Sequence, residues 1–126
     1  AGASIAQLEA NGVVTVIGTV VNPAGLTHVK AVPIRRAMAF AEPGLGASPV
    51  WHAFAIDQAG IAFSDDIGVV GDERIRIDLN ALHGIGDGLA WAPGAFFDQS
   101  GDEIPACSRG TLARVAARLA DAGLVR

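Results

Sequence analysis

Two adjacent acids, Asp65 and Asp66, are candidate catalytic groups in the segment AIDQAGIAFSDDIG, residues 55–68. Carboxylates held this close repel each other, and the repulsion raises the pKa of one of them toward the range useful for proton transfer. Such a pair would act as a general acid or base if its loop entered a binding pocket. Acids in loops are more often solvated surface groups. The pair predicts a loop with catalytic potential, and a solvated surface loop is the alternative.

The other reactive residue types are dispersed. His28, His52 and His83 are far apart in the sequence and one cysteine accompanies them, so the usual zinc-binding spacings are absent. Cys107 precedes a predicted helix, where a thiol pKa falls, but no histidine lies near it in the sequence. A structural cysteine is favoured, with a small thiol enzyme as the alternative. The spacing predicts no metal site in this chain.

The glycine-rich stretch GIGDG, residues 84–88, lacks the surroundings of a nucleotide-binding loop. A dinucleotide-binding loop follows a strand and opens a helix, whereas this stretch follows His83 and no helix comes after it. The single lysine, Lys30, lies in a predicted strand and not after a glycine-rich loop. We therefore predict an ordinary loop at 84–88 and no cofactor-binding residues.

The composition bounds the class of protein. A chain of 126 residues fits one compact domain. Its residues are 51% hydrophobic and 17% charged, with mean hydropathy +0.40, so part of its surface is predicted to contact a partner. A net charge of -4 argues against nucleic acid, and no apolar run is long enough for a membrane helix. The lone cysteine and the lack of a leader sequence favour the cytoplasm.

The first third of the chain predicts a helix, a hairpin and a second helix. Apolar spacing behind a capping serine favours a short helix over 4–10. Strands at 13–21 and 26–32 are joined by Asn-Pro-Ala-Gly at 22–25, a strong turn signal. A proline then opens a helix over 34–41, because its missing donor costs nothing in a first turn.

The middle of the chain predicts loops and short strands. Residues 42–49 are rich in proline and glycine and indicate a loop. Short strands are predicted at 50–56 and 60–63. Residues 69–79 end in a regular alternation of apolar and charged side chains, which indicates a half-buried strand.

The last third predicts a strand at 89–98, broken at Pro93-Gly94, and then a helix ending at Gly123. Ser108 or Thr111 is the expected cap of this helix. The order of elements predicts an α+β domain: a mostly antiparallel sheet of about five or six strands, with helices packed on one face and the sheet curled around the last helix.

Three stretches together resemble the N-terminal domain of the glutamine synthetase family, in a divergent branch. VVNPAGLTHVKAVP, residues 20–33, is similar to the opening hairpin of that family. GDERIRIDLNAL, residues 71–82, is similar to its Ser-Asp-Met-x-Leu-x-Pro-Asp strand, with Asp72 and Asp78 matching the two acids. Residues 89–119 are similar to its strand, turn and Pro-Arg helix start.

The resemblance implies a single β-grasp domain over residues 1–126 that ends before a catalytic domain. It also implies that the parent is an ATP-dependent ligase that joins glutamate to ammonia or another amine through γ-glutamyl phosphate, with Mg or Mn as the metal. In the family this domain packs against the catalytic domain of its own and the neighbouring subunit in an oligomer. One of its loops closes the shared active site.

The loop that performs this closure in typical members reads Asp-Gly-Ser-Ser, a motif that this chain lacks. The nearest acids are Asp57, Asp65 and Asp66, so these are the candidate site residues that the resemblance implies. They do not form a complete catalytic set, and we expect the fragment alone to be inactive. The alternative is a free-standing β-grasp module that binds a protein partner without catalysis.

Overall fold

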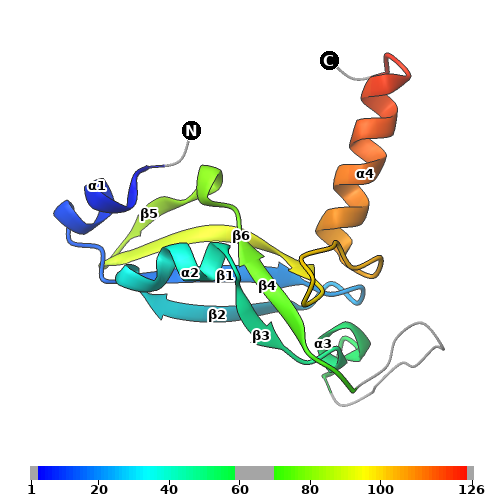
Figure 1. Ribbon diagram of the computed structural model, residues 1–126, viewed down its shortest axis with the longest axis horizontal. Coiled ribbons are helices and arrows are strands. Elements are labelled where there is room, and N and C mark those ends of the chain that lie inside the picture. Colours follow the sequence, from blue (N-terminus) through cyan, green and yellow to red (C-terminus); the bar gives the residue numbers. More distant parts are fainter. Residues whose placement is uncertain (1–2, 59–69, 125–126) are drawn as a thin grey trace.

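The computed structural model describes residues 3–58 and 70–124, and its centre is a mixed sheet curled into a half-barrel (Figure 1). The strands are β1 (Thr15–Val21), β2 (Thr27–Pro33), β3 (Leu45–Ala47), β4 (Glu73–Ile77), β5 (His83–Gly86) and β6 (Leu89–Phe97). The helices are α1 (Ile5–Ala10), α2 (Ala37–Ala41), α3 (Val50–Ala53) and α4 (Ser108–Asp121), with short 3-10 turns at Ile34–Arg36 and Leu79–Ala81.

The strand order is β2-β1-β6-β4-β3, and β5 pairs with β6 off this path. Strands β1 and β6 run parallel, while the other pairs in the described residues are antiparallel. This arrangement confirms the predicted α+β, β-grasp-like fold with a sheet of five or six strands.

The predicted local signals at the start of the chain are confirmed. Ser4 caps α1 through a capping box, in which its hydroxyl accepts from the Gln7 backbone while the Gln7 side chain accepts from the Ser4 backbone. Strands β1 and β2 form the predicted hairpin, with Val21 opposite Thr27. Gly25 has φ +84, the left-handed conformation that the predicted turn requires.

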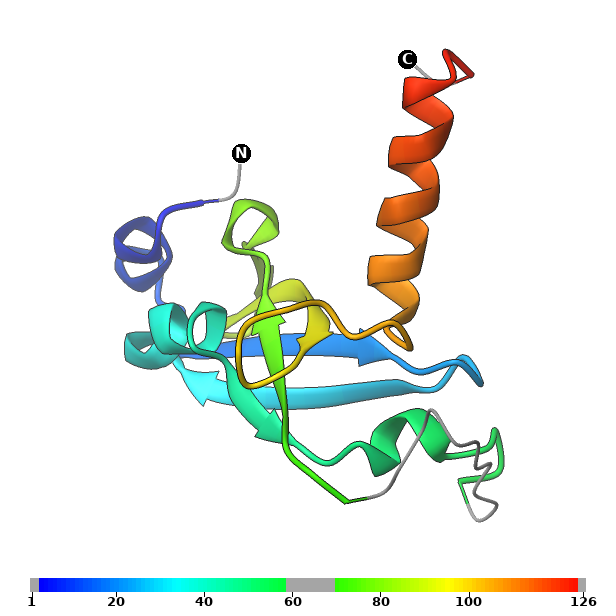
Figure 2. The same ribbon diagram turned by 45° about the vertical axis from the view of Figure 1, so that its right-hand side comes forward.

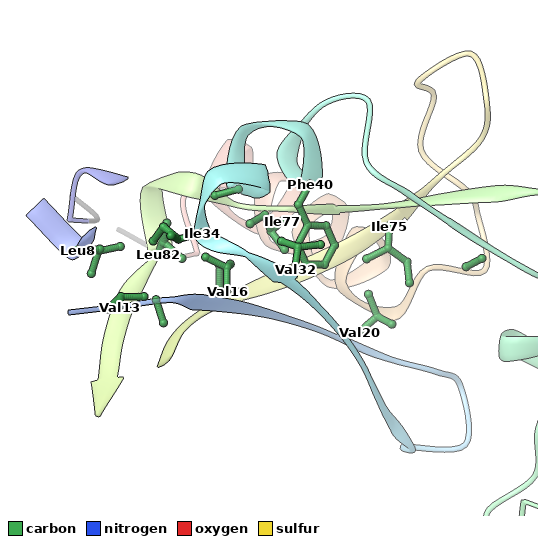
Figure 3. Close-up of a cluster of buried hydrophobic side chains, with 14 of the residues drawn as sticks. Leu8, Val13, Val16, Val20, Val32, Ile34, Phe40, Ile75, Ile77 and Leu82 are labelled. Carbon is green, nitrogen blue, oxygen red and sulfur yellow. The ribbon is translucent and has the colours of Figure 1, made fainter. Parts of the chain in front are cut away.

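One face of the sheet carries the core, because alternate residues of β1, β4 and β6 are buried there. Figure 3 shows these side chains meeting those of the helices. Phe40 of α2 is fully buried and packs closely over Gly18, where a Cβ would lie 2.4 Å from Cζ of Phe40. Glycine at this position therefore lets α2 cover the sheet. The labelled core residues are Leu8, Val13, Val16, Val20, Val32, Ile34, Phe40, Ile75, Ile77 and Leu82.

Two predictions for the middle of the chain are wrong. Residues 50–53 form helix α3 where a strand is predicted, because the Ser48 hydroxyl accepts from Val50 N at 3.2 Å and the Ser48 carbonyl accepts from Trp51 N at 3.1 Å. Within the predicted loop 42–49, β3 pairs with β4, a contact that no local signal encodes. The strand predicted at 60–63 lies outside the described residues.

Two predictions around β6 are also wrong. Part of the predicted loop 84–88 is strand β5, and β6 is continuous through Pro93. The Pro93 carbonyl accepts from Asp78 N at 2.9 Å, so its nitrogen faces the gap between β5 and β4. No ladder hydrogen bond is needed in that gap, which explains why proline is tolerated inside this strand.

Helix α4 stands away from the sheet (Figure 2). The predicted curling of the sheet around this helix is therefore wrong, because α1 and α2 cover the core face instead. Gly123 has φ +73 and ends the helix as predicted, whereas the N-terminal cap is Cys107 and not Ser108 or Thr111. None of the helices within residues 3–58 and 70–124 has the length and apolar character required to span a membrane.

Candidate functional site at the root of the 54–72 segment

The predicted site acids belong to the segment between α3 and β4. Asp57 lies in an exposed turn shortly after α3. Asp65 and Asp66 lie outside the described residues, so their roles stay predictions. The structure does describe where this segment leaves and rejoins the sheet. We call that place the loop root and define it as residues 46–54, residue Glu73, and the residues of β2 and of the β1–β2 turn that hold them.

Asn22 fixes α3 to the β1–β2 turn. Its side chain is 1% exposed, and its Nδ2 donates to the carbonyls of Trp51 at 3.0 Å and Phe54 at 2.9 Å. Its Oδ1 accepts from Leu26 N at 2.9 Å. One buried amide therefore satisfies the last turn of α3 and the hairpin turn together, because buried polar groups require partners.

A buried histidine–glutamate pair ties α3 to β4. Nε2 of His52 lies 2.6 Å from Oε2 of Glu73, and the two side chains are 2% and 11% exposed. The His52 ring also contacts Phe96 of the core, with ring centroids 4.2 Å apart. The pair thus joins the start of the segment to its return point, and Nδ1 of His52 is buried without a hydrogen-bond partner.

Strand β2 holds the outer side of the loop root. Lys30 donates to the carbonyl of Gly46 in β3 and lies over the Trp51 ring, 5.3 Å from its centroid. His28 stacks on the same ring with centroids 4.9 Å apart and lies near Phe54. Burial lowers the pKa of His28 below its ordinary value of 6.5. Because β2 and β3 are the two edges of the sheet, the lysine contact closes the curl.

The side chains of the loop root are arranged for a structural role and not for catalysis. A general acid or base must reach its substrate, whereas His52 and Glu73 are both enclosed and paired with each other. In the described part of the chain, no group of three His, Cys, Asp or Glu could hold a metal ion. The described residues therefore offer no set of ligands for the Mg or Mn that the resemblance implies, and no step through ATP or the metal follows from them.

Cys107 has a structural role. It is 2% exposed, and its sulfur accepts from Phe96 N at 3.3 Å and from Gly110 N at 3.4 Å. A catalytic thiolate has to be accessible, so the geometry disfavours the thiol enzyme. Arg109 pairs with Asp78 at 3.6 Å.

Sequence reasoning missed the residues that build the loop root. In the sequence, Asn22 has the context of an ordinary turn residue. Glu73 and Lys30 have the context of exposed charged residues in strands. The available signal was the proximity of His52 and Trp51 in an otherwise apolar run, which indicates buried polar groups in need of partners.

No family model matches the chain. It is 37% identical over 118 residues to gamma-glutamylpolyamine synthetase GlnA3 from Streptomyces coelicolor, a match covering 91% of this chain and 25% of that protein. The chain thus spans about a quarter of the length of that relative.

Solved structures share the fold. A glutamine synthase homolog superposes with TM-score 0.71 at 22% identity, over 87% of this chain and 27% of that one. GmaS in complex with ADP gives 0.72 at 19% identity, over 93% and 25%. Glutamine synthetase from Plasmodium falciparum gives 0.67 at 17% identity, over 96% and 23%.

Proposed function

This chain belongs to the glutamine synthetase family, and on that premise we propose that it is the N-terminal domain of an ATP-dependent carboxylate–amine ligase. The observation that carries the proposal is the 37% identity over 118 residues to a gamma-glutamylpolyamine synthetase. The parent would join the γ-carboxyl of glutamate to an amine through γ-glutamyl phosphate. ATP and a divalent metal would be bound by parts of the parent outside this chain.

We propose that the amine is a polyamine and not ammonia. The relative is named for a polyamine acceptor, and this chain lacks the Asp-Gly-Ser-Ser motif that the resemblance associates with ammonium. The acids Asp57, Asp65 and Asp66 are proposed to attract the cationic polyamine, since opposite charges raise the local substrate concentration.

The proposed contribution of this domain is to hold the 54–72 segment at a shared active site and to pack against the catalytic domains of its own and the neighbouring subunit. The support is mechanical: the loop root fixes both ends of the segment through Asn22, Lys30 and the His52–Glu73 pair. A closing loop must start from a rigid base to position its side chains. A cytoplasmic oligomer is part of the same proposal.

The test is a ligase assay on the longer protein that contains this chain. Phosphate release would be measured with glutamate, ATP and Mg, and with either spermidine or ammonium as the acceptor. We expect turnover with spermidine and at least about tenfold lower kcat/KM with ammonium. Preference for ammonium would overturn the acceptor proposal, and no turnover with any amine would overturn the ligase proposal.

A second candidate is a β-grasp module that binds a protein partner without catalysis. The observation in its favour is the exposed apolar surface of α4, where Leu112 is 69%, Val115 44% and Leu119 39% exposed. This candidate predicts no phosphate release in any form of the protein. The same assay therefore separates the two functions.

A further inference from the structure

A cavity of about 300 Å³ lies at the base of α4, where it is lined by residues of β4, β6 and α4 and by Ala41 of α2. We call it the basal cavity. Pro93, Ala95 and Phe97 of β6 form its apolar floor, and Ala113 of α4 lies on its far wall. Its size is at the lower end of the range found for small-molecule sites.

Charged side chains rim this cavity, and the acids among them already have partners. Asp78 pairs with Arg109 at 3.6 Å, and Glu103 pairs with Arg114 at 3.1 Å. Arg76 also lines the cavity. In residues 3–58 and 70–124, no carboxylate lies within ion-pair distance of it. Each acid of the rim therefore has an arginine partner, whereas the positive charge of Arg76 is not balanced by an ion pair within the described residues.

Arg76 is held in place without being neutralised. Its guanidinium lies over the Phe97 ring, 5.1 Å from the centroid, and its end packs against Gly101. Its Nε is buried and has no hydrogen-bond partner. The buried Nε is closed to solvent, so a ligand would meet the terminal nitrogens of the guanidinium, and a stacked, rigid guanidinium loses little freedom when it binds an anion.

From this arrangement we propose that the basal cavity binds a monocarboxylate with a small apolar body. A single negative charge would pair with Arg76, whereas a phosphate dianion would be repelled by Asp78 and Glu103. A planar carboxylate matches the fork of an arginine, and the apolar floor takes the carbon chain. The carboxylate is either that of a free acid or an Asp or Glu side chain from the rest of the longer protein.

The test uses hexanoate as the probe and uncharged hexanamide as its matched control, with binding to the 126-residue chain followed by calorimetry and by amide NMR shifts of Gly101 and Gly110. We expect saturable hexanoate binding and about tenfold or greater weakening for hexanamide, since charge-assisted hydrogen bonds are roughly twice as strong as neutral ones. Equal binding of the two probes, or no hexanoate binding, would overturn the proposal.

Variants localise the site. Arg76→Gln should weaken hexanoate binding about tenfold, while Arg35→Gln, an exposed arginine away from the cavity, should leave it unchanged. Wild-type affinity in Arg76→Gln would overturn the proposal. If that variant fails to fold, Arg109→Gln tests the rim from the other side, because this residue is exposed and its replacement leaves the core intact.

The longer protein distinguishes the two sources of the carboxylate. Hexanoate binding in both the 126-residue chain and the longer protein assigns the cavity to a free acid. Binding in the 126-residue chain alone assigns it to a side chain of the remainder that already occupies the cavity. Either result supports a monocarboxylate site at Arg76. If the 126-residue chain does not bind hexanoate, the proposal is wrong for both sources.

Discussion

The loop root and helix α4 are both attached to one end of the sheet, but they are held in opposite ways. Helix α3 in the loop root has four residues, too few to be stable alone, and it is fixed by buried polar contacts to Asn22 of the β1–β2 turn and to Glu73 of β4. Helix α4 has fourteen residues and is fixed at its first turn, where Gly110 is buried. Every residue from Thr111 to Leu124 is exposed.

Helix length and apolar pattern therefore do not measure how firmly a segment is held. The apolar stripe of α4 is regular, but a stripe stabilises a helix only when a partner covers it. The short α3 has no such stripe, and its hydrogen bonds with Asn22 and Glu73 satisfy polar groups that would otherwise be buried without a partner. Substitutions in the two regions should therefore have very different costs.

The largest effect is expected for Glu73→Ala. The substitution leaves the enclosed His52 side chain without its partner, and removing one member of a buried pair costs about 3 kcal/mol. Urea denaturation would measure the change in the free energy of unfolding. Glu73→Gln keeps a hydrogen-bond acceptor and should cost less. Equal stability of Glu73→Ala and the wild type would show that the pair does not anchor the segment.

Asn22→Ala should come next, at about 2 kcal/mol. It removes the donor to the Trp51 and Phe54 carbonyls and the acceptor for Leu26 N, at a site that is 1% exposed. The matched control is Asn80→Ala. The Asn80 side chain is exposed, so this substitution should lower the free energy of unfolding by less than about 0.5 kcal/mol. Thermal melting of both variants measures the contrast, and similar costs for the two would remove the special role of Asn22.

Acidification should weaken the loop root by a smaller amount. The pKa of His28 is lowered by burial, so below its ordinary value of 6.5 the unfolded chain binds a proton that the folded chain resists. The free energy of unfolding should therefore fall as the pH drops from about 7.5 to about 5.5. His28 faces Trp51 and Phe54, with Lys30 on the same tryptophan ring.

The comparison variant for this pH effect is His28→Phe, which keeps an aromatic ring against Trp51 and removes the titrating group. Its unfolding free energy should depend less on pH over the same range. An unchanged pH dependence in this variant would assign the effect to other groups.

The smallest effect is expected in α4. Leu119→Ala removes an exposed side chain from a helix that tolerates alanine well, so the cost should be within about 0.5 kcal/mol. Amide hydrogen exchange should also be faster along 113–121 than along β6, because nothing covers this part of the helix. A cost as large as that of Asn22→Ala would mean that α4 is held by more than its base.

Sequence patterns predicted the elements whose signals are local. The capping serine of α1, the turn at 22–25 and the terminator Gly123 each act within a few residues, and all three are found in the structure. The strand at β4 was predicted from its alternation, which reflects one buried face. The resemblance to the glutamine synthetase family rested on these same stretches.

Long-range contacts account for the failures. The strand predicted at Val50–Ile56 agrees with the local propensities of its residues, but Asn22, 29 residues before Trp51, bonds the Trp51 carbonyl and favours the helix. Strand β3 exists because its three residues pair with β4, and β6 tolerates Pro93 because no ladder bond is needed beside it.

Neighbouring residues and composition are enough to predict the caps, turns and alternating strands of this domain and its high apolar content. The partners of the buried polar groups become visible only in the folded structure. Asn22 bonds the Phe54 carbonyl, His52 pairs with Glu73, and Arg76 lies over the Phe97 ring beside the basal cavity. The physical reason is that the cost of burying a polar group is set by the partner it meets, and in all three cases that partner lies more than twenty residues away in the sequence.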